Sequence, residues 1–201
     1  MKRRTKSSPK VVLLAGPNGA GKSTLAPALL RDTLHVSNFV NADVIARGLS
    51  AYGGEDQGIA AGRVMLARLR ELAAKRVDFA FESTLASRSF APWIAEICRE
   101  HGYEFHLVFI WLRTPGVAIA RVKARSRLGG HDVAPEVIGR RYTRGVRNFF
   151  ELYAPLARTW HFYDNSEERL KLLAKGGQRR SERIHDAKLW AEINKASPRE
   201  S

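Results

Sequence analysis

The stretch GPNGAGKST, residues 16–24, matches the phosphate-binding pattern G-x-x-x-x-G-K-[ST]. It follows the apolar run KVVLLAG (10–16), which predicts a buried parallel strand, and a helix is expected from Lys22 to about Arg31. In this setting the glycines let successive backbone N–H groups surround phosphate oxygens, and the helix N-terminus adds partial positive charge. The stretch therefore predicts a nucleotide-binding P-loop.

Most of the predicted contacts to ATP come from this loop. Lys22 is expected to reach the β- and γ-phosphates, and the Ser23 hydroxyl is expected to ligate Mg²⁺. The predicted cofactor-binding residues of the loop are Gly16, Asn18, Gly19, Ala20, Gly21, Lys22, Ser23 and Thr24. Asn165, at the end of the predicted strand WHFYDNS (160–166), is expected near the adenine, with a simple turn at 164–166 as the alternative.

P-loops of this kind occur in transporters, GTPases, motors and small-molecule kinases. The segment AKGGQ (174–178) is reminiscent of a transporter ATPase signature, but no apolar strand ending in Asp-Glu follows it. No NKxD-type guanine motif is present, and the apolar strand FHLVFIWL (105–112) ends without the acid of a motor ATPase. These features favour the kinase branch.

The fold is predicted from the alternation of short apolar runs with helical segments. This order is typical of an α/β, three-layer P-loop NTPase of the nucleotide-kinase type, with a parallel sheet flanked by helices and a helical lid. One domain is expected over 10–196, with a disordered basic tail at 1–9 and a second tail at 197–201. The expected strands are 10–16, 38–43, 78–84, 105–112, 160–166 and 170–174, and the expected helices are 22–31, 43–49, 57–76, 90–101, 115–128, 135–153 and 184–195. In the 57–76 helix, Val64, Leu66, Leu69 and Leu72 give the apolar spacing.

Composition bounds the partners and the compartment. The 201 residues carry a net charge of +14, so anionic partners are expected. The single cysteine, Cys98, permits no internal disulfide, which is typical of the cytoplasm. No segment approaches the roughly 20 apolar residues of a membrane span, so no membrane partner is expected.

Two acids follow predicted strands and are expected at the same edge of the sheet as the P-loop. Asp43 ends NFVNAD and is placed to orient or deprotonate an attacking hydroxyl, with a helix-capping role as the alternative. Glu82 follows the apolar FAF, where a carboxylate costs desolvation energy unless it is paired or used.

A lid is predicted over about 121–147, where arginines flank a glycine pair. The planar guanidinium fork binds phosphate oxygens, although several of these arginines are expected to be merely solvated. Arg140, Arg144 and Arg147 share one predicted helix face, whereas Arg141 lies on another. His131, after the glycines, is either a ligand contact or a structural residue.

Together these motifs resemble the zeta toxin family of P-loop kinases over roughly residues 10–166. The resemblance rests on the order of GPNGAGKST, NADVIA, FEST, GGHDV, RRYTR and YDNS. It implies an ATP-dependent kinase that phosphorylates a hydroxyl of UDP-N-acetylglucosamine and is often restrained by an antitoxin.

The resemblance also implies residue roles. Asp43 matches the family's general base, Lys22 and Ser23 the ATP and magnesium contacts, and Glu82 with Thr84 the substrate contacts, to which we add His131. Arg127 and Arg141 match the phosphate-clamping arginines. The rival interpretations are a housekeeping kinase for another small metabolite, a nucleic-acid-binding ATPase, which the absence of an aromatic platform disfavours, and a non-catalytic nucleotide sensor.

Overall fold

A seven-stranded sheet in the order β2-β3-β1-β4-β5-β6-β7 forms the centre of the computed structural model. The structure describes residues 8–49, 55–130, 132–178 and 180–195. The strands are β1 (Lys10–Ala15), β2 (Asn38–Val40), β3 (Phe79–Ser83), β4 (Glu104–Trp111), β5 (Thr159–Asp164), β6 (Lys171–Gly177) and β7 (Arg180–Ile184). Strands β1 to β5 pair in parallel, and β6 and β7 add an antiparallel edge. The mostly parallel sheet confirms the predicted α/β P-loop NTPase fold.

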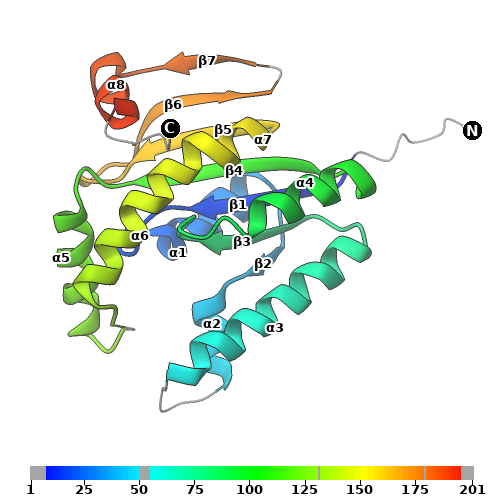
Figure 1. Ribbon diagram of the computed structural model, residues 1–201, viewed down its shortest axis with the longest axis horizontal. Coiled ribbons are helices and arrows are strands. Elements are labelled where there is room, and N and C mark those ends of the chain that lie inside the picture. The colour runs from blue at the N-terminus through cyan, green and yellow to red at the C-terminus, as the bar shows by residue number, and fades with distance from the viewer. Residues whose placement is uncertain (1–7, 50–54, 131, 179, 196–201) are drawn as a thin grey trace, which may run out of the picture.

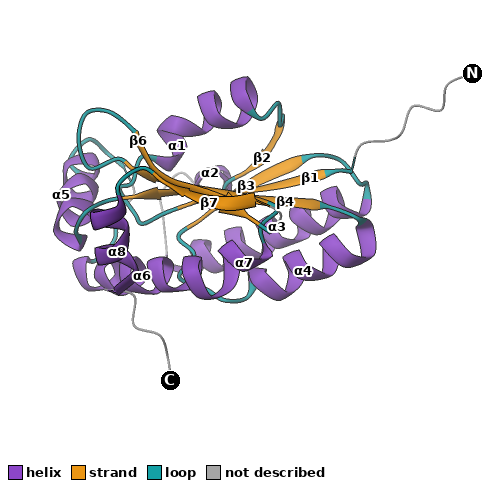
Figure 2. Cartoon of the chain, turned by 90° about the horizontal axis from the view of Figure 1, so that it is seen from above, coloured by secondary structure: helices purple, strands orange, loops and turns teal. Residues whose placement is uncertain are grey.

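Helices cover both faces of this sheet (Figures 1 and 2). They are α1 (Lys22–Ala26), η1 (Pro27–Thr33), α2 (Ala42–Leu49), α3 (Glu55–Ala74), α4 (Phe90–His101), α5 (Pro115–Ser126), α6 (Pro135–Asn148), η2 (Phe149–Tyr153), α7 (Ala154–Leu156) and α8 (Ala187–Lys195). Side chains of α3, α4, α8 and the end of α6 pack in one core, and those of α1, η1 and α5 pack in the other. None of the described helices is both long enough and apolar enough to span a bilayer.

Aromatic rings fill the larger core where β4 and β5 meet α6, η2 and α8. Phe109 and Phe162 stack with their ring centroids 5.0 Å apart, and Phe149 meets Phe162 edge to face at 5.0 Å. Trp160 stacks on Trp190 at 5.7 Å, so the C-terminal helix α8 is held to the sheet by the same cluster. The end of α6, η2, β5 and α8 therefore share one core.

The buried face of α3 differs from the predicted one. Val64 and Leu66 are 44% and 41% exposed, while Leu69 and Leu72 are buried as expected. Ala61 and Met65 complete the buried stripe instead, at four-residue spacing ahead of Leu69. The prediction was wrong because it weighted the large aliphatic residues and passed over alanine and methionine.

Two other boundaries also differ. The helix after the P-loop is regular only to Ala26 and continues as a π-helix from Pro27, since proline has no N–H to donate to the helical ladder. Strand β7 was not predicted, because RSERI (180–184) has one apolar residue and resembles a solvated turn. Such charged edge strands are common where a sheet ends, and α8 accordingly begins at Ala187 rather than Ile184.

Candidate active site

The P-loop backbone adopts conformations that only glycine tolerates. Gly16 has φ +142°, and a Cβ there would lie 2.1 Å from the carbonyl oxygen of Ile110 on β4. Gly21 has φ +85°, and its Cβ would lie 2.9 Å from Nδ2 of Asn165. The loop is thus fitted tightly between β4 and the loop after β5, with no room for side chains at these positions.

Lys22 is folded back onto this loop and is only 6% exposed. Its Nζ donates to the carbonyl oxygens of Gly16 and Pro17, both at 2.9 Å, and lies 3.5 Å from Oε1 of Glu82. Burial lowers the pKa of Lys22, while the charges of Glu82 and Asp43 oppose that shift. The lysine is therefore held in a site rich in acceptor oxygens, within the electrostatic reach of both predicted acids.

Glu82 is tied directly to the P-loop. It is the penultimate residue of β3, opposite Leu14 of β1, and its Oε2 accepts hydrogen bonds from Ser23 Oγ at 2.9 Å and from Asn41 Nδ2 at 2.8 Å. A carboxylate and a hydroxyl in contact form the kind of oxygen pair that Mg²⁺ prefers. The structure thus brings Glu82 together with Lys22 and Ser23.

Asn41, and not Asp43, has the helix-capping role that was the alternative for Asp43. Its Oδ1 accepts from the backbone N–H of Asp43 at 2.8 Å and of Val44 at 3.1 Å, so Asn41 caps helix α2. The Asp43 side chain is exposed in the first turn, and its carboxylate has no hydrogen-bond partner among the described residues. Asp43 is consequently available for chemistry rather than used as a cap.

Thr84 lies two residues beyond Glu82, in the loop between β3 and α4. Helix α6 presses on this loop, since a Cβ on Gly145 would lie 2.4 Å from the Thr84 carbonyl oxygen. Asn148 adds a hydrogen bond of 2.6 Å from its Nδ2 to the carbonyl oxygen of Leu85, which has φ +57°. The position of Thr84 is therefore set by the C-terminal half of α6.

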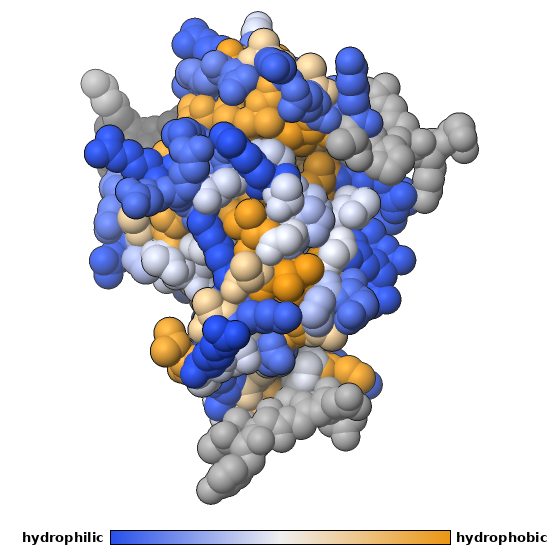
Figure 3. Space-filling model, turned by 90° about the vertical axis from the view of Figure 1, so that its left-hand side faces the viewer, coloured by the Kyte–Doolittle hydropathy of each residue, from blue (hydrophilic) through white to orange (hydrophobic). Residues whose placement is uncertain are grey.

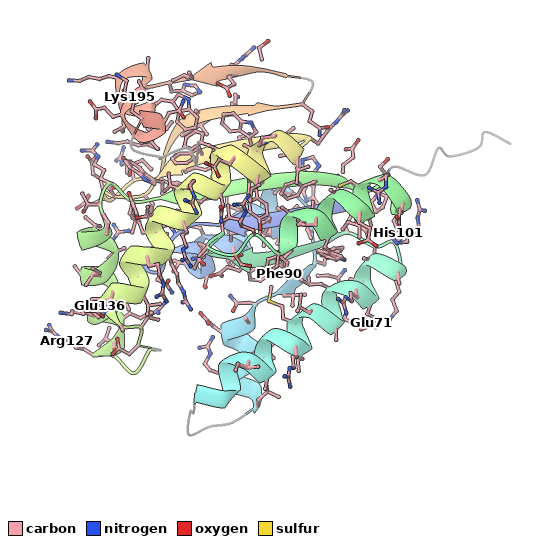
Figure 4. All side chains as sticks on the ribbon, viewed as in Figure 1. Glu71, Phe90, His101, Arg127, Glu136 and Lys195 are labelled. Atoms are coloured by element: carbon pink, nitrogen blue, oxygen red, sulfur yellow. The ribbon has the colours of Figure 1, made fainter. Side chains whose placement is uncertain are left out.

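The predicted lid arginines occupy different places. Arg127 lies at the outer end of α5, near Glu136 at the start of α6 (Figure 4), and Arg141 is half-buried on α6. Figure 3 shows that hydrophilic side chains dominate the side of the molecule on which α5 lies. His131 lies outside the described residues.

Sequence reasoning did not single out Arg125, whose positive charge helps to lower the pKa of Lys22 and which therefore lies within electrostatic range of the P-loop. It lies four residues after Arg121 on α5, so the two share one helix face. Arg121 Nη1 donates to the Asn165 carbonyl oxygen at 2.8 Å. The four-residue spacing of Arg121 and Arg125 could have indicated from the sequence that these two arginines share a helix face.

Asn165 links the loop after β5 to the P-loop. Its Nδ2 donates to the carbonyl oxygen of Ala20 at 2.9 Å, and a Cβ on Gly19 would lie 2.8 Å from the Ala118 carbonyl oxygen of α5. Together with Arg121, these contacts join three segments around the base of the P-loop. Trp160 and Phe162, earlier in β5, are buried in the core, as expected.

A P-loop between β1 and α1, on a mostly parallel sheet, defines a P-loop NTPase fold of the kinase-like kind. The chain belongs to the family described as an AAA domain, which it matches over residues 11–148. It is also 29% identical over 133 residues to an uncharacterized protein of Haemophilus influenzae, covering 66% of this chain and 92% of that protein.

Solved structures share the fold at low sequence identity. The AvrRxo1-ORF1:-ORF2 complex with ATP matches with a TM-score of 0.75 at 15% identity, over 96% of this chain and 66% of that chain. A structure of the PezAT chromosomal toxin–antitoxin system of Streptococcus pneumoniae matches with a TM-score of 0.60 at 16% identity, over 81% of this chain and 70% of that chain. The chain thus spans 66% of the length of the first of these.

Proposed function

We propose that this chain is an ATP-dependent kinase that transfers the γ-phosphate to a hydroxyl of a small anionic molecule. One observation carries the proposal: the buried ammonium of Lys22 lies 3.5 Å from Oε1 of Glu82 at the carboxyl edge of β1 and β3, and the charge of Asp43 also raises the pKa of Lys22. Ligands of open parallel sheets bind at this edge. A phosphate-binding lysine beside two acids provides the groups that phosphoryl transfer needs.

The residues present fit ATP and Mg²⁺. Gly16 and Gly21 let the P-loop pack closely against β4 and Asn165, and Ser23 with Glu82 supplies adjacent oxygen ligands. When bound there, Mg²⁺ would neutralise negative charge on the phosphates of ATP. In this proposal Ser23 and Glu82 would hold Mg²⁺, and Asn165 supports the P-loop next to the adenine base of ATP.

In the proposed reaction, Lys22 leaves the carbonyl oxygens of Gly16 and Pro17 and pairs with the phosphates. Asp43 accepts the proton of the acceptor hydroxyl while that oxygen attacks the γ-phosphorus, and the β–γ bridging oxygen departs on ADP. Arg125 stabilises the charge that grows on the transferring group. The predicted role of Arg127 as a clamp requires closure of the lid, whereas that of Arg141, which is adjacent to Tyr142 on α6, does not rest on such a movement.

Packing restricts where such closure can occur. Tyr142 donates to the Leu112 carbonyl oxygen at 2.6 Å, and Asn148 is buried against the loop that carries Thr84. The C-terminal half of α6 is thus anchored, so we propose that closure moves the outer end of α5 and the start of α6. This would bring Arg127 toward the phosphates and exclude water.

The finer proposal is a kinase of the zeta toxin type in the cytoplasm, with UDP-N-acetylglucosamine as the first acceptor to test. The resemblance in motif order and the fold shared with the PezAT structure support it. Glu82, Thr84 and His131 are the proposed acceptor contacts, and an antitoxin is the proposed protein partner. A housekeeping kinase for another small hydroxyl compound is the alternative.

Transfer from ATP to a panel of UDP-sugars and small metabolites tests the proposal, with wild type beside Asp43→Asn and Asp32→Asn. Asp32 is an exposed acid at the end of η1, so its replacement controls for the lost charge. We expect Asp43→Asn to lower kcat by on the order of 100-fold and Asp32→Asn to leave it unchanged. Near-normal transfer by Asp43→Asn would remove Asp43 from this role.

The growth of cells that express the chain distinguishes a toxin from a housekeeping kinase. Expression of the wild-type chain is expected to arrest growth, and Lys22→Ala is expected to abolish that effect while the protein still accumulates. Unimpaired growth with the wild-type chain, together with transfer to a metabolite outside the UDP-sugars, would favour the housekeeping kinase.

A further inference from the structure

A second cationic site lies on β5, β6 and β7, away from the P-loop. A pocket of about 380 Å³ is formed there by residues of these three strands alone, among them Thr159, His161, Lys175, Ser181 and Arg183. The pocket lies at the amino end of β5, whereas the P-loop lies at the carboxyl ends of the parallel strands (Figure 1). It is therefore separate from the site described above.

Strand register places three cationic or ionisable side chains in one row. His161 of β5 is opposite Lys175 of β6, and Lys175 is opposite Arg183 of β7. Neighbouring strands lie about 4.8 Å apart, so the row spans roughly 10 Å. All three side chains line the pocket from one face of the sheet, since alternate residues of a strand share a face, and Trp160 and Gly176 also border it.

Two of these three side chains, those of Lys175 and Arg183, are permanently cationic at neutral pH. Neither Lys175 nor Arg183 forms an ion pair with a carboxylate within the described ranges. Glu182 lies on the other face, because its Cγ would be 3.2 Å from a Cβ on Gly176, which points toward Trp160. Like charges on directly opposed residues destabilise a sheet, and a bound anion would relieve that repulsion.

Thr159 adds a hydroxyl at the edge of the same pocket. Its Oγ1 lies 2.8 Å from Nδ1 of His106, whose buried Nε2 makes no hydrogen bond to any residue that the structure describes. His106 Nε2 lies 3.9 Å from Oε2 of Glu104. In the tautomer with the proton on Nδ1, His106 donates to Thr159, and the Thr159 hydroxyl hydrogen can then point into the pocket. Ser181 supplies a second hydroxyl.

We propose that this pocket binds the phosphate group of a small phosphorylated ligand. Lys175 and Arg183 would contact the phosphate oxygens through charge-assisted hydrogen bonds, with Thr159 and Ser181 donating from their hydroxyls. A volume of about 380 Å³ is at the small end of ligand sites and suits a compact molecule such as a phosphomonoester or pyrophosphate rather than a polymer. The site does not depend on the proposed kinase activity.

Amide chemical shifts of the full-length, ¹⁵N-labelled chain test this, with inorganic phosphate and pyrophosphate as separate titrants. We expect saturable shifts in β5, β6 and β7 with a Kd of their own, apart from those of the P-loop. Lys175→Gln and Arg183→Gln should each weaken the response of these strands at least about tenfold while leaving the P-loop response intact. Lys188→Gln, on exposed α8, is the matched control and should change neither response.

Three outcomes would overturn the proposal. The first is the absence of saturable shifts in β5 to β7 with either titrant, and the second is a response that survives both Lys175→Gln and Arg183→Gln. The third is saturable binding here by a single-stranded oligonucleotide but not by phosphate or pyrophosphate, which would assign the surface to nucleic acid. Because the P-loop amides report on the fold in every sample, an unfolded variant is recognised and excluded.

Discussion

The Ser23 hydroxyl donates a 2.9 Å hydrogen bond to Oε2 of Glu82, so the P-loop and β3 share one carboxylate. This contact follows from sheet order, because β3 is the direct neighbour of β1 and Glu82 is opposite Leu14. A residue expected from its motif to face the acceptor is thus bound to the nucleotide side of the site. We therefore assign Glu82 two proposed duties, to Mg²⁺ and to the acceptor.

Glu82→Gln keeps the size and hydrogen-bonding capacity of the side chain and removes its charge. We expect magnesium-dependent transfer to fall by on the order of 100-fold, because the oxygen pair with Ser23 loses its anionic member. The Mg²⁺ concentration needed for half-maximal rate should rise as well. Glu71→Gln, at an exposed position of α3, is the charge-matched control. A Glu82→Gln enzyme with an unchanged Mg²⁺ requirement would contradict the assignment.

Asn41 joins the α2 cap to the Glu82 carboxylate, so its replacement should affect both stability and transfer. Asn41→Ala is expected to cost about 1 kcal/mol of unfolding free energy through loss of the cap. Asn41→Asp keeps a capping oxygen but places a second carboxylate next to Glu82. We therefore expect this variant to lose little stability and more of its activity. Denaturant unfolding and steady-state rates of both variants test this, and equal losses of stability in the two would argue against the capping role.

The sequence predicted the central fold well because its signals are local. The P-loop glycines, the apolar runs of β1 and β4 and the helix at Phe90–His101 are each read from neighbouring residues. The bounds of that helix were predicted to the residue. Strand β7 escaped prediction because it depends on pairing with β6 rather than on its own composition.

The site was harder to predict, since its members meet only through tertiary packing. Asp43 and Glu82 were found because each was expected at the end of a strand. Asp43 instead lies in the first turn of α2, since β2 ends at Val40, and Glu82 lies within β3. The cap was assigned to Asp43 as an alternative, whereas Asn41, two residues earlier, is the cap. Arg125 is one of many arginines in its segment, and only the fold shows that its charge lies within electrostatic range of Lys22. Such roles depend on which strands and helices meet in the folded chain, and no local sequence pattern specifies those contacts.

His106 should make the fold sensitive to mild acid. Burial lowers its pKa below the ordinary value of 6.5; Glu104 opposes the shift, and Lys10, Arg158 and His161 add to it. Between the lowered pKa and 6.5 the unfolded chain binds more protons than the folded one, so stability rises with pH through that window and is lost as pH falls.

His106→Gln removes this titration while keeping a partner for Thr159. We expect the urea midpoint of the wild type to fall more than that of the variant between about pH 7.5 and about pH 5. His101→Gln, on α4, is the control for a general loss of histidine and should follow the wild type. Parallel pH profiles for wild type and His106→Gln would show that His106 does not contribute.

Replacement of either of two glycines of α6 by alanine is expected to change the stability of the chain, in opposite directions at the two positions. A Cβ on Gly139 would meet no atom within 4 Å, whereas a Cβ on Gly145 would lie 2.4 Å from the backbone carbonyl oxygen of Thr84. Gly139→Ala should therefore stabilise the chain by roughly 0.5–1 kcal/mol through helix propensity. Gly145→Ala should destabilise it by roughly 1–3 kcal/mol, because helix and loop must move apart.

The same displacement should reach the active site, because Thr84 is two residues from Glu82 on the loop that α6 supports. Gly145→Ala is expected to lower transfer at temperatures where it remains folded, while Gly139→Ala keeps the wild-type rate. Thermal unfolding and initial rates of the two variants give both readouts from one pair of proteins. If Gly145→Ala were as stable and as active as Gly139→Ala, α6 would not be fixing the acceptor side of the site, and the anchoring that confines lid closure to the outer end of α5 would have to be abandoned.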